Sequence, residues 1–191
     1  MDLLTIIILA IGLSMDAFAV SICKGLAIKK LRFADALIVG IWFGGFQALM
    51  PFLGYILGIQ FEKFIKTIAP IVAFLLLAVI GINMLREAIF EKDEEEEDDS
   101  LNPKEMLLMA IATSIDAMAV GISFACVSVE IMAGKGGIEN TLLACGIIGI
   151  ITCILSMSGA KVGNVFGTKY EKKAEIVGGI ILIILGIRML F

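Results

Sequence analysis

Apolar residues along this chain form six long runs that are separated by shorter polar segments. The runs cover approximately residues 3–24, 33–60, 67–88, 104–128, 140–162 and 173–190. Each is close to the roughly 20 apolar residues that a helix needs to cross the hydrocarbon core of a membrane. The pattern therefore predicts an all-α, polytopic membrane protein with six transmembrane helices.

The composition agrees with this class of protein. Hydrophobic residues make up 60% of the 191 residues, the mean hydropathy is +1.03, and only 18% of the residues are charged. The first run is expected to be a span and not a cleavable signal peptide, because Asp2 stands where such peptides carry basic residues. Membrane lipid is thus the expected surroundings, and nothing in the sequence indicates a nucleic-acid partner or a soluble catalytic domain.

Lysine and arginine are distributed unevenly between the two sides of the six predicted spans. Eleven of the fifteen lie in or next to the first, third and fifth loops: Lys24, Lys29, Lys30, Arg32, Arg86, Lys92, Lys104, Lys161, Lys169, Lys172 and Lys173. Cytoplasmic loops carry such an excess of positive residues. The odd-numbered loops are therefore predicted to be cytoplasmic and both termini to be outside.

A repeat divides the chain into two halves of three spans. Asp16 matches Asp116 at an offset of 100 residues, and Gly44, Gly54 and Gly58 match Gly149, Gly159 and Gly163 at an offset of 105. Since three is odd, the second half enters the membrane from the opposite side. We expect two inverted three-helix repeats, residues 1–90 and 104–191, with binding near the membrane midplane where the halves meet.

An acidic segment joins the two halves. Eight of the nine residues from Glu91 to Asp99 are acidic, and they account for the net charge of −4. Such a segment has no apolar surface to bury, so residues 91–103 are expected to form a solvated cytoplasmic linker. Its field could also attract divalent cations to the cytoplasmic side.

Each half carries one aspartate near the middle of a predicted span, within near-copies of one phrase. Asp16 lies in LSMDAFAV at 13–20, and Asp116 lies in TSIDAMAV at 113–120. An ionised carboxylate at the bilayer centre costs about 2.5 to 3.5 kcal/mol, so two of them indicate a function. A transported cation is the simplest one, although protonated aspartates that only hold helices together remain an alternative.

The available side chains restrict the kind of cation. Histidine is absent, and Cys23, Cys126, Cys145 and Cys153 form no CxxC pair. A bound metal must therefore be held mainly by oxygen, which favours hard ions such as Mg²⁺, Ca²⁺ or Mn²⁺. Gln47, near the centre of the second span, is a candidate neutral ligand, with packing as an equal alternative. Its repeat partner Thr152 is expected to pack, because its hydroxyl can bond to its own helix.

The duplicated aspartate phrase, the GGFQ motif at 44–47 with Pro51, Gly54 and Gly58, and six spans in under 200 residues resemble the MntP family of bacterial manganese efflux pumps. That family is grouped with the lysine exporter superfamily. The resemblance covers essentially the whole chain. It implies export of Mn²⁺ across the bacterial cytoplasmic (inner) membrane, with Asp16 and Asp116 recognising the metal.

These observations together predict a secondary transporter that alternates between two inverted halves and is not an enzyme. No cofactor is expected, and protons could be the counter-ion, since two nearby carboxyls titrate as a coupled pair. Two alternatives stay open: export of another substrate such as Cd²⁺ or an amino acid, and an intramembrane aspartyl protease. The sequence does not determine the metal preference or the oligomeric state.

Overall fold

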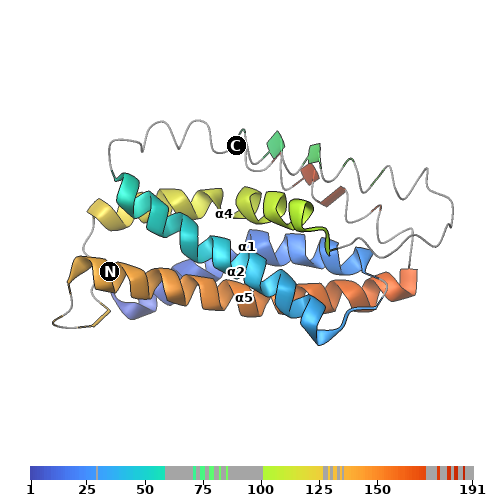
Figure 1. Cartoon of the computed structure of the whole chain (residues 1–191), viewed down its shortest axis with the longest axis horizontal. Coiled ribbons are helices and arrows are strands. Elements are labelled where there is room, and N and C mark those ends of the chain that lie inside the picture. Colours follow the sequence, from blue (N-terminus) through green and yellow to red (C-terminus); the bar gives the residue numbers. More distant parts are fainter. Residues whose placement is uncertain are drawn as a thin grey trace.

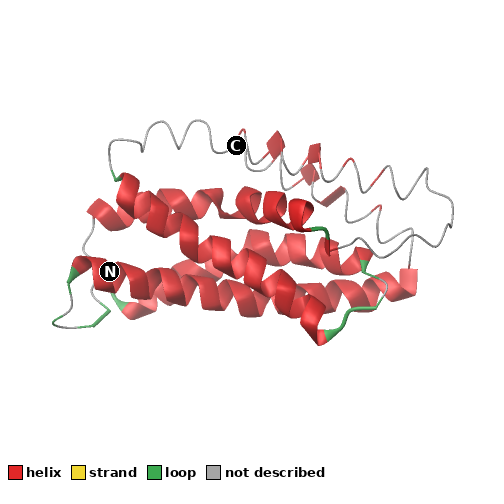
Figure 2. Cartoon of the chain, in the orientation of Figure 1, coloured by secondary structure: helices red, strands yellow, loops and turns green. Residues whose placement is uncertain are grey.

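The architecture is a bundle of long helices packed along a common direction, with α2 running obliquely across it (Figures 1 and 2). The computed structural model describes residues 1–28, 30–58, 101–126, 129, 131–132, 134 and 136–170, with scattered residues between 71 and 85 and between 176 and 187. The helices with defined bounds are α1 (Leu3–Ala27), α2 (Phe33–Leu57), α4 (Pro103–Cys126) and α5 (Gly137–Tyr170). All four are long and apolar enough to cross a membrane. The chain is a multi-pass membrane protein.

The expected all-α class and four of the six expected spans are confirmed. Most of the other two, 67–88 and 173–190, lies outside the described residues, as does the acidic run of 91–99. Within the third expected span, Ile71, Leu75, Val79 and Ile82 are helical and exposed. Their spacing of three or four residues places them on one helical face, which is the pattern of a helix that turns an apolar side to lipid.

The helices run in opposite directions in two pairs. In Figure 1, α1 and α5 run in one direction and α2 and α4 in the other. Side-chain contacts agree, because Ser14 of α1 bonds to Thr152 of α5, and Asn164 further along α5 bonds to Ile28 just after α1. Each of the two pairs therefore consists of parallel helices from different halves of the chain.

Glycines allow the backbones within these pairs to touch. A methyl group built on Gly54 of α2 would lie 2.0 Å from the Met118 carbonyl oxygen of α4, and one built on Gly159 of α5 would lie 2.7 Å from the Phe18 carbonyl oxygen of α1. Gly54 and Gly159 are equivalent in the repeat, and so are Met118 and Phe18. Close approach of this kind is how membrane helices pack without a hydrophobic driving force between them.

Helix α2 crosses α5 at the point where two further equivalent glycines meet. A methyl group on Gly44 would lie 2.6 Å from the Gly149 carbonyl oxygen, and one on Gly149 would lie 2.8 Å from the Gly44 carbonyl oxygen. The contact is reciprocal. The two helices therefore approach each other backbone to backbone, with only the β-carbons of Ala48 and Cys153 equally near.

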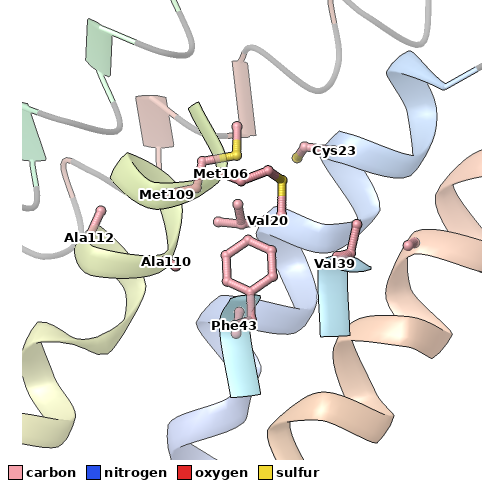
Figure 3. Close-up of a cluster of buried hydrophobic side chains, with 10 residues drawn as sticks. Val20, Cys23, Val39, Phe43, Met106, Met109, Ala110 and Ala112 are labelled. Carbon is pink, nitrogen blue, oxygen red and sulfur yellow. The ribbon is translucent and has the colours of Figure 1, made fainter. Parts of the chain in front are cut away.

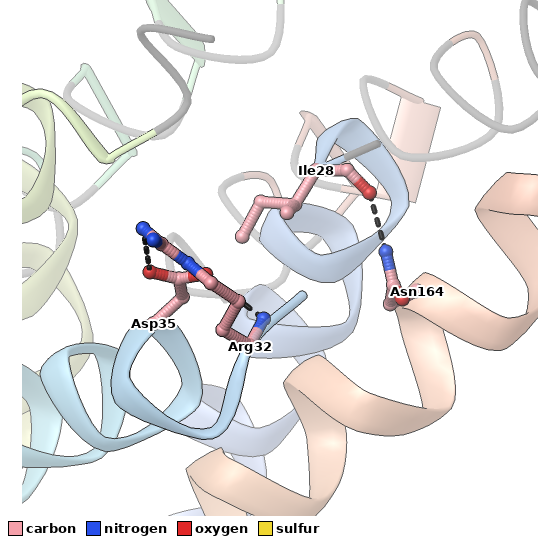
Figure 4. Close-up of polar contacts among 4 residues, drawn as sticks. All are labelled: Ile28, Arg32, Asp35 and Asn164. Atoms are coloured by element: carbon pink, nitrogen blue, oxygen red, sulfur yellow. Dashed lines mark hydrogen bonds and ion pairs between the residues drawn. The ribbon is translucent and has the colours of Figure 1, made fainter. Parts of the chain in front are cut away.

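Polar groups hold the helix ends at one end of the bundle. Asn164 donates from its side-chain amide to the Ile28 carbonyl, and Asp35 accepts from the Arg32 backbone and guanidinium at the start of α2 (Figure 4). At the opposite end, Asp2 caps α1 by accepting from Thr5. These hydrogen bonds lower the pKa of the Asp2 carboxyl. Short loops and caps thus fix where α1 and α2 begin and end.

Two helices continue past the ends expected for their spans. Lys24, assigned to the first loop, lies inside α1 and is buried, because α1 continues to Ala27. The fifth span was expected to end at 162, but α5 continues to Tyr170, with Lys161 on its exposed side. At about 1.5 Å per residue, this 34-residue helix is about 51 Å long, which exceeds the roughly 30 Å hydrocarbon core.

The backbone contact at Gly54 predicts a selective loss of stability. Gly54→Ala places a methyl group against the Met118 carbonyl, and the helices must move apart to accept it. We expect the midpoint of thermal unfolding in detergent to fall by roughly 5 to 10 °C. Gly45→Ala on the same helix is the matched control, because a methyl group there meets nothing within 4 Å. Equal midpoints for the two variants would contradict the contact.

Candidate functional site

Asp16 and Asp116 lie at matching depths in the bundle. Asp16 is the fourteenth residue of α1 and Asp116 is the fourteenth of α4, so each stands close to the middle of its helix. Both side chains are half-buried. The carboxyl of Asp116 interacts electrostatically with Asp16 and accepts a hydrogen bond from the Ala117 backbone at 2.8 Å. The structure therefore places the two predicted acids within electrostatic reach of each other, although they are 100 residues apart in the sequence.

Gln47 of α2 is the third predicted residue, and it reaches the same part of α1. Its side chain is fully buried, and its Nε2 donates to the Leu13 carbonyl oxygen at 3.0 Å. Leu13 lies one turn before Asp16. The other end of the amide, Oε1, is buried and has no hydrogen-bond partner among the described residues. A buried carbonyl without a donor is costly, so this oxygen is available to a ligand.

Three hydroxyls, those of Ser14, Ser114 and Thr152, are already satisfied by the helices that carry them. Thr152 of α5 donates to the Ile148 carbonyl at 2.9 Å and lies 2.7 Å from the Ser14 hydroxyl, which in turn bonds to the Ala10 carbonyl. Ser114 bonds to the Ala110 carbonyl in the same way. The prediction that Thr152 packs through a bond to its own helix is confirmed.

Buried apolar side chains fill the space between the helices on both sides of Asp16 and Asp116. We call the first group the Phe43 cluster (Figure 3); its fully buried members are Ala17, Val20, Cys23, Val39, Phe43, Met106, Met109, Ala110, Ala112 and Ala160. We call the second the Ile148 cluster; its buried members are Ile6, Ala10, Phe124, Val129, Ala144 and Ile148. On α1 and α4 the aspartates fall between the two clusters. The carboxyls are thus separated from both ends of the bundle by packed apolar groups.

Two carboxyls and one amide oxygen define what the site can bind. Two ionised carboxylates would neutralise a doubly charged cation, and the amide oxygen would add a neutral ligand. Among the described residues, no group of three or more His, Cys, Asp or Glu side chains could hold a metal. Asp16, Asp116 and Gln47 would therefore supply only part of the oxygen ligands that a divalent cation takes. A partial set of ligands suits a cation that is bound reversibly.

Reasoning from the sequence missed two buried polar groups. The Ser156 hydroxyl of α5 is buried and has no partner among the described residues. Lys24 is buried and forms an ion pair with Glu105 of α4. No local pattern marks Ser156 as unusual. The burial of Lys24 could have been suspected because it lies within helical reach of Val20 and Cys23, but its partner is 81 residues away.

Comparison with known proteins identifies the family. Residues 30–190 match the family model described as "Putative manganese efflux pump". A protein of that description from Acetivibrio thermocellus is 49% identical over 191 residues, which cover 100% of this chain and 91% of the relative. Relatives of the same description from Mannheimia succiniciproducens (48% identical) and Campylobacter jejuni (49% identical) are each matched over 96% of their length, with 100% of this chain covered.

No solved structure matches the chain. The family model covers most of the sequence, and the full-length relatives extend the match to its first residues. The shared length includes the helices that carry both aspartates and Gln47. The chain therefore belongs to the MntP family, whose members carry the description "Putative manganese efflux pump".

Proposed function

We propose that this chain exports Mn²⁺ from the cytoplasm across the bacterial cytoplasmic membrane as a secondary transporter. The relatives are named as manganese efflux pumps, and family membership makes the chain a transporter and not an enzyme. The observation that carries the proposal is the electrostatic contact of Asp16 and Asp116 at mid-helix, together with Gln47, which bonds to Leu13 one turn before Asp16 and whose Oε1 is buried with no hydrogen-bond partner among the described residues. The intramembrane protease is therefore set aside.

The site chemistry supports a hard divalent cation as the cargo. Two carboxylates balance its charge, and Mn²⁺ accepts carboxylate, carbonyl and water oxygens readily. No lysine or arginine lies next to the aspartates on α1 or α4, which argues against an amino acid whose carboxylate would need a positive partner. After the metal leaves, the same carboxyls can take up protons, so proton exchange for Mn²⁺ fits the pair.

The transport mechanism we propose is alternating access between two inverted three-helix halves. Equivalent contacts support it: Gly54 against Met118 repeats Gly159 against Phe18, and Gly44 meets its own counterpart Gly149. The opposed directions of α1 and α4 fit a site between inverted halves. Third and sixth spans complete the halves, and a solvated linker at 91–103 joins them. In this topology the Lys24 end of the bundle faces the cytoplasm.

Neutralising either aspartate is expected to abolish export. Asp16→Asn and Asp116→Asn each keep the side-chain shape but leave one charge to balance a doubly charged cation. Uptake of Mn²⁺ into inside-out membrane vesicles is the measurement, at equal protein abundance. Asp35→Asn is a control, since Asp35 pairs with Arg32 at the helix end and lies far from the site. Wild-type uptake by either site variant would contradict the assignment.

Gln47 and Thr152 occupy equivalent positions but are expected to differ in effect. Gln47→Leu removes the amide oxygen, so the Mn²⁺ concentration for half-maximal uptake should rise roughly 10- to 100-fold, the range seen when a supporting group is lost from a metal site. Thr152→Val removes a hydroxyl that is bonded within its own helix. It should change that concentration less than about twofold. The reverse order would assign the ligand to α5.

The proposed orientation is open to a direct labelling test. Lys30 and Gly136 are exposed and lie at opposite ends of the bundle, after α1 and before α5. With single cysteines at these positions in an otherwise cysteine-free chain, a membrane-impermeant maleimide added to intact cells should label position 136 and not position 30. Labelling of both positions from one side would rule out the inverted arrangement.

A further inference from the structure

A buried ion pair joins α1 to α4 at the end of the bundle where α1 finishes. The Lys24 Nζ lies 2.6 Å from Glu105 Oε2, and the exposed fractions of the two side chains are 3% and 32%. Burying such a pair costs desolvation that the attraction repays only partly, so a buried ion pair is weak evidence for stability. Separating the pair leaves a buried charge without its partner, so it opens only when one of the two groups gains another partner.

The Phe43 cluster lies between the aspartates and the Lys24–Glu105 ion pair. Lys24 is eight residues from Asp16 along α1, about 12 Å, and Glu105 is eleven residues from Asp116 along α4, about 16 Å. The cluster residues Val20 and Cys23 on α1, and Met106 and Met109 on α4, fill these intervals (Figure 3). The ion pair thus holds together the two helices that carry the metal-binding carboxyls.

The opposite end of the bundle has no such pair at the equivalent positions. In the repeat, Lys24 corresponds to Phe124 and Glu105 corresponds to Thr5. Phe124 is 3% exposed and belongs to the Ile148 cluster, while Thr5 bonds to Asp2. One end is therefore closed by charge together with apolar packing, and the other by apolar packing at these positions.

We propose that the Lys24–Glu105 ion pair is the cytoplasmic gate of the transporter, and that a divalent cation opens it by competing with Lys24 for the Glu105 carboxylate. The proposal rests on the export function and topology given above. While the pair is intact, the Lys24 ammonium repels cations and keeps α1 and α4 together. The more exposed carboxylate of Glu105 is what an arriving cation meets first. Once Lys24 is released, the helices can separate and expose the aspartates to the cytoplasm.

Two native cysteines report the state of each end. Cys23 lies in the Phe43 cluster and is fully buried, while Cys145 lies in α5 near the Ile148 cluster and is 3% exposed. Two single-cysteine versions, each with the other three cysteines replaced by alanine, are treated with a membrane-impermeant maleimide. Inside-out vesicles report on Cys23, and right-side-out vesicles report on Cys145.

The gate predicts opposite changes at the two cysteines. Glu105→Gln removes the charge that holds Lys24, so labelling of Cys23 should become roughly three- to tenfold faster as the two-state population moves toward the cytoplasm-open form. Labelling of Cys145 should become slower. Lys161→Met, which removes an exposed charge near the same end of α5, should change neither rate. Faster labelling of both cysteines, or of neither, would overturn the gate, since it would mean a loosened fold or no effect.

A double variant that exchanges the two charged residues provides a second test if Glu105→Gln folds poorly. Lys24→Glu combined with Glu105→Lys restores an ion pair, so both labelling rates should return to within about twofold of wild type. Rates in the exchanged protein that match Glu105→Gln would overturn the proposal, because the pair itself would then not be the closing element. Mn²⁺ should also speed the labelling of Cys23 in wild type and not in Glu105→Gln.

Uptake of Mn²⁺ by wild-type vesicles, measured in parallel, separates this proposal from the export function. If wild type takes up Mn²⁺ and the labelling rates of Glu105→Gln equal those of wild type, the gate is wrong and the export function stands. If wild type takes up no Mn²⁺, the export function is wrong, whatever the labelling shows.

Discussion

Two carboxyls that lie within electrostatic reach of each other inside a membrane-spanning bundle repel each other when both are ionised. Asp16 and Asp116 are in this position. Their repulsion is relieved when a cation binds or when a proton is taken up. The other polar groups near the two carboxyls add no further negative charge. The third polar group, Gln47, is neutral, and the neighbouring hydroxyls of Ser14 and Ser114 are bonded within their own helices.

The site depends on glycine because the helices that carry it cross at very short distances. Gly54 against Met118 brings α2 to α4, two residues from Asp116, and Gly159 against Phe18 brings α5 to α1, two residues from Asp16. Any larger residue at these glycines would move an aspartate-bearing helix outward. The glycine contacts thus set the spacing of the carboxyls without touching them.

The sequence allowed four span positions to be predicted, and it singled out Asp16, Asp116 and Gln47 as candidate ligands because intramembrane charges are rare and the repeat points to matched depths. It could not predict the Lys24–Glu105 pair. A lysine near the end of an apolar run is typical of a loop or of a side chain reaching to the membrane surface, and its partner is brought near only by packing of α1 on α4. The end of α5 was also missed, since Lys161 and Gly163 suggest a span end, whereas Gly163 packs on Ile22 of α1.

The reciprocal contact of Gly44 and Gly149 affects how fast the two helices could turn against each other. Rotation of packed helices usually requires side chains to leave one rotamer and enter another. At this crossing the nearest side-chain atoms are the β-carbons of Ala48 and Cys153, which have little or no rotamer freedom to change their position. The contact of Gly44 and Gly149 itself therefore needs no rotamer change when the helices turn, and the side chains that would have to move are those of Met157 and Cys153, which pack on Gly40 one turn away.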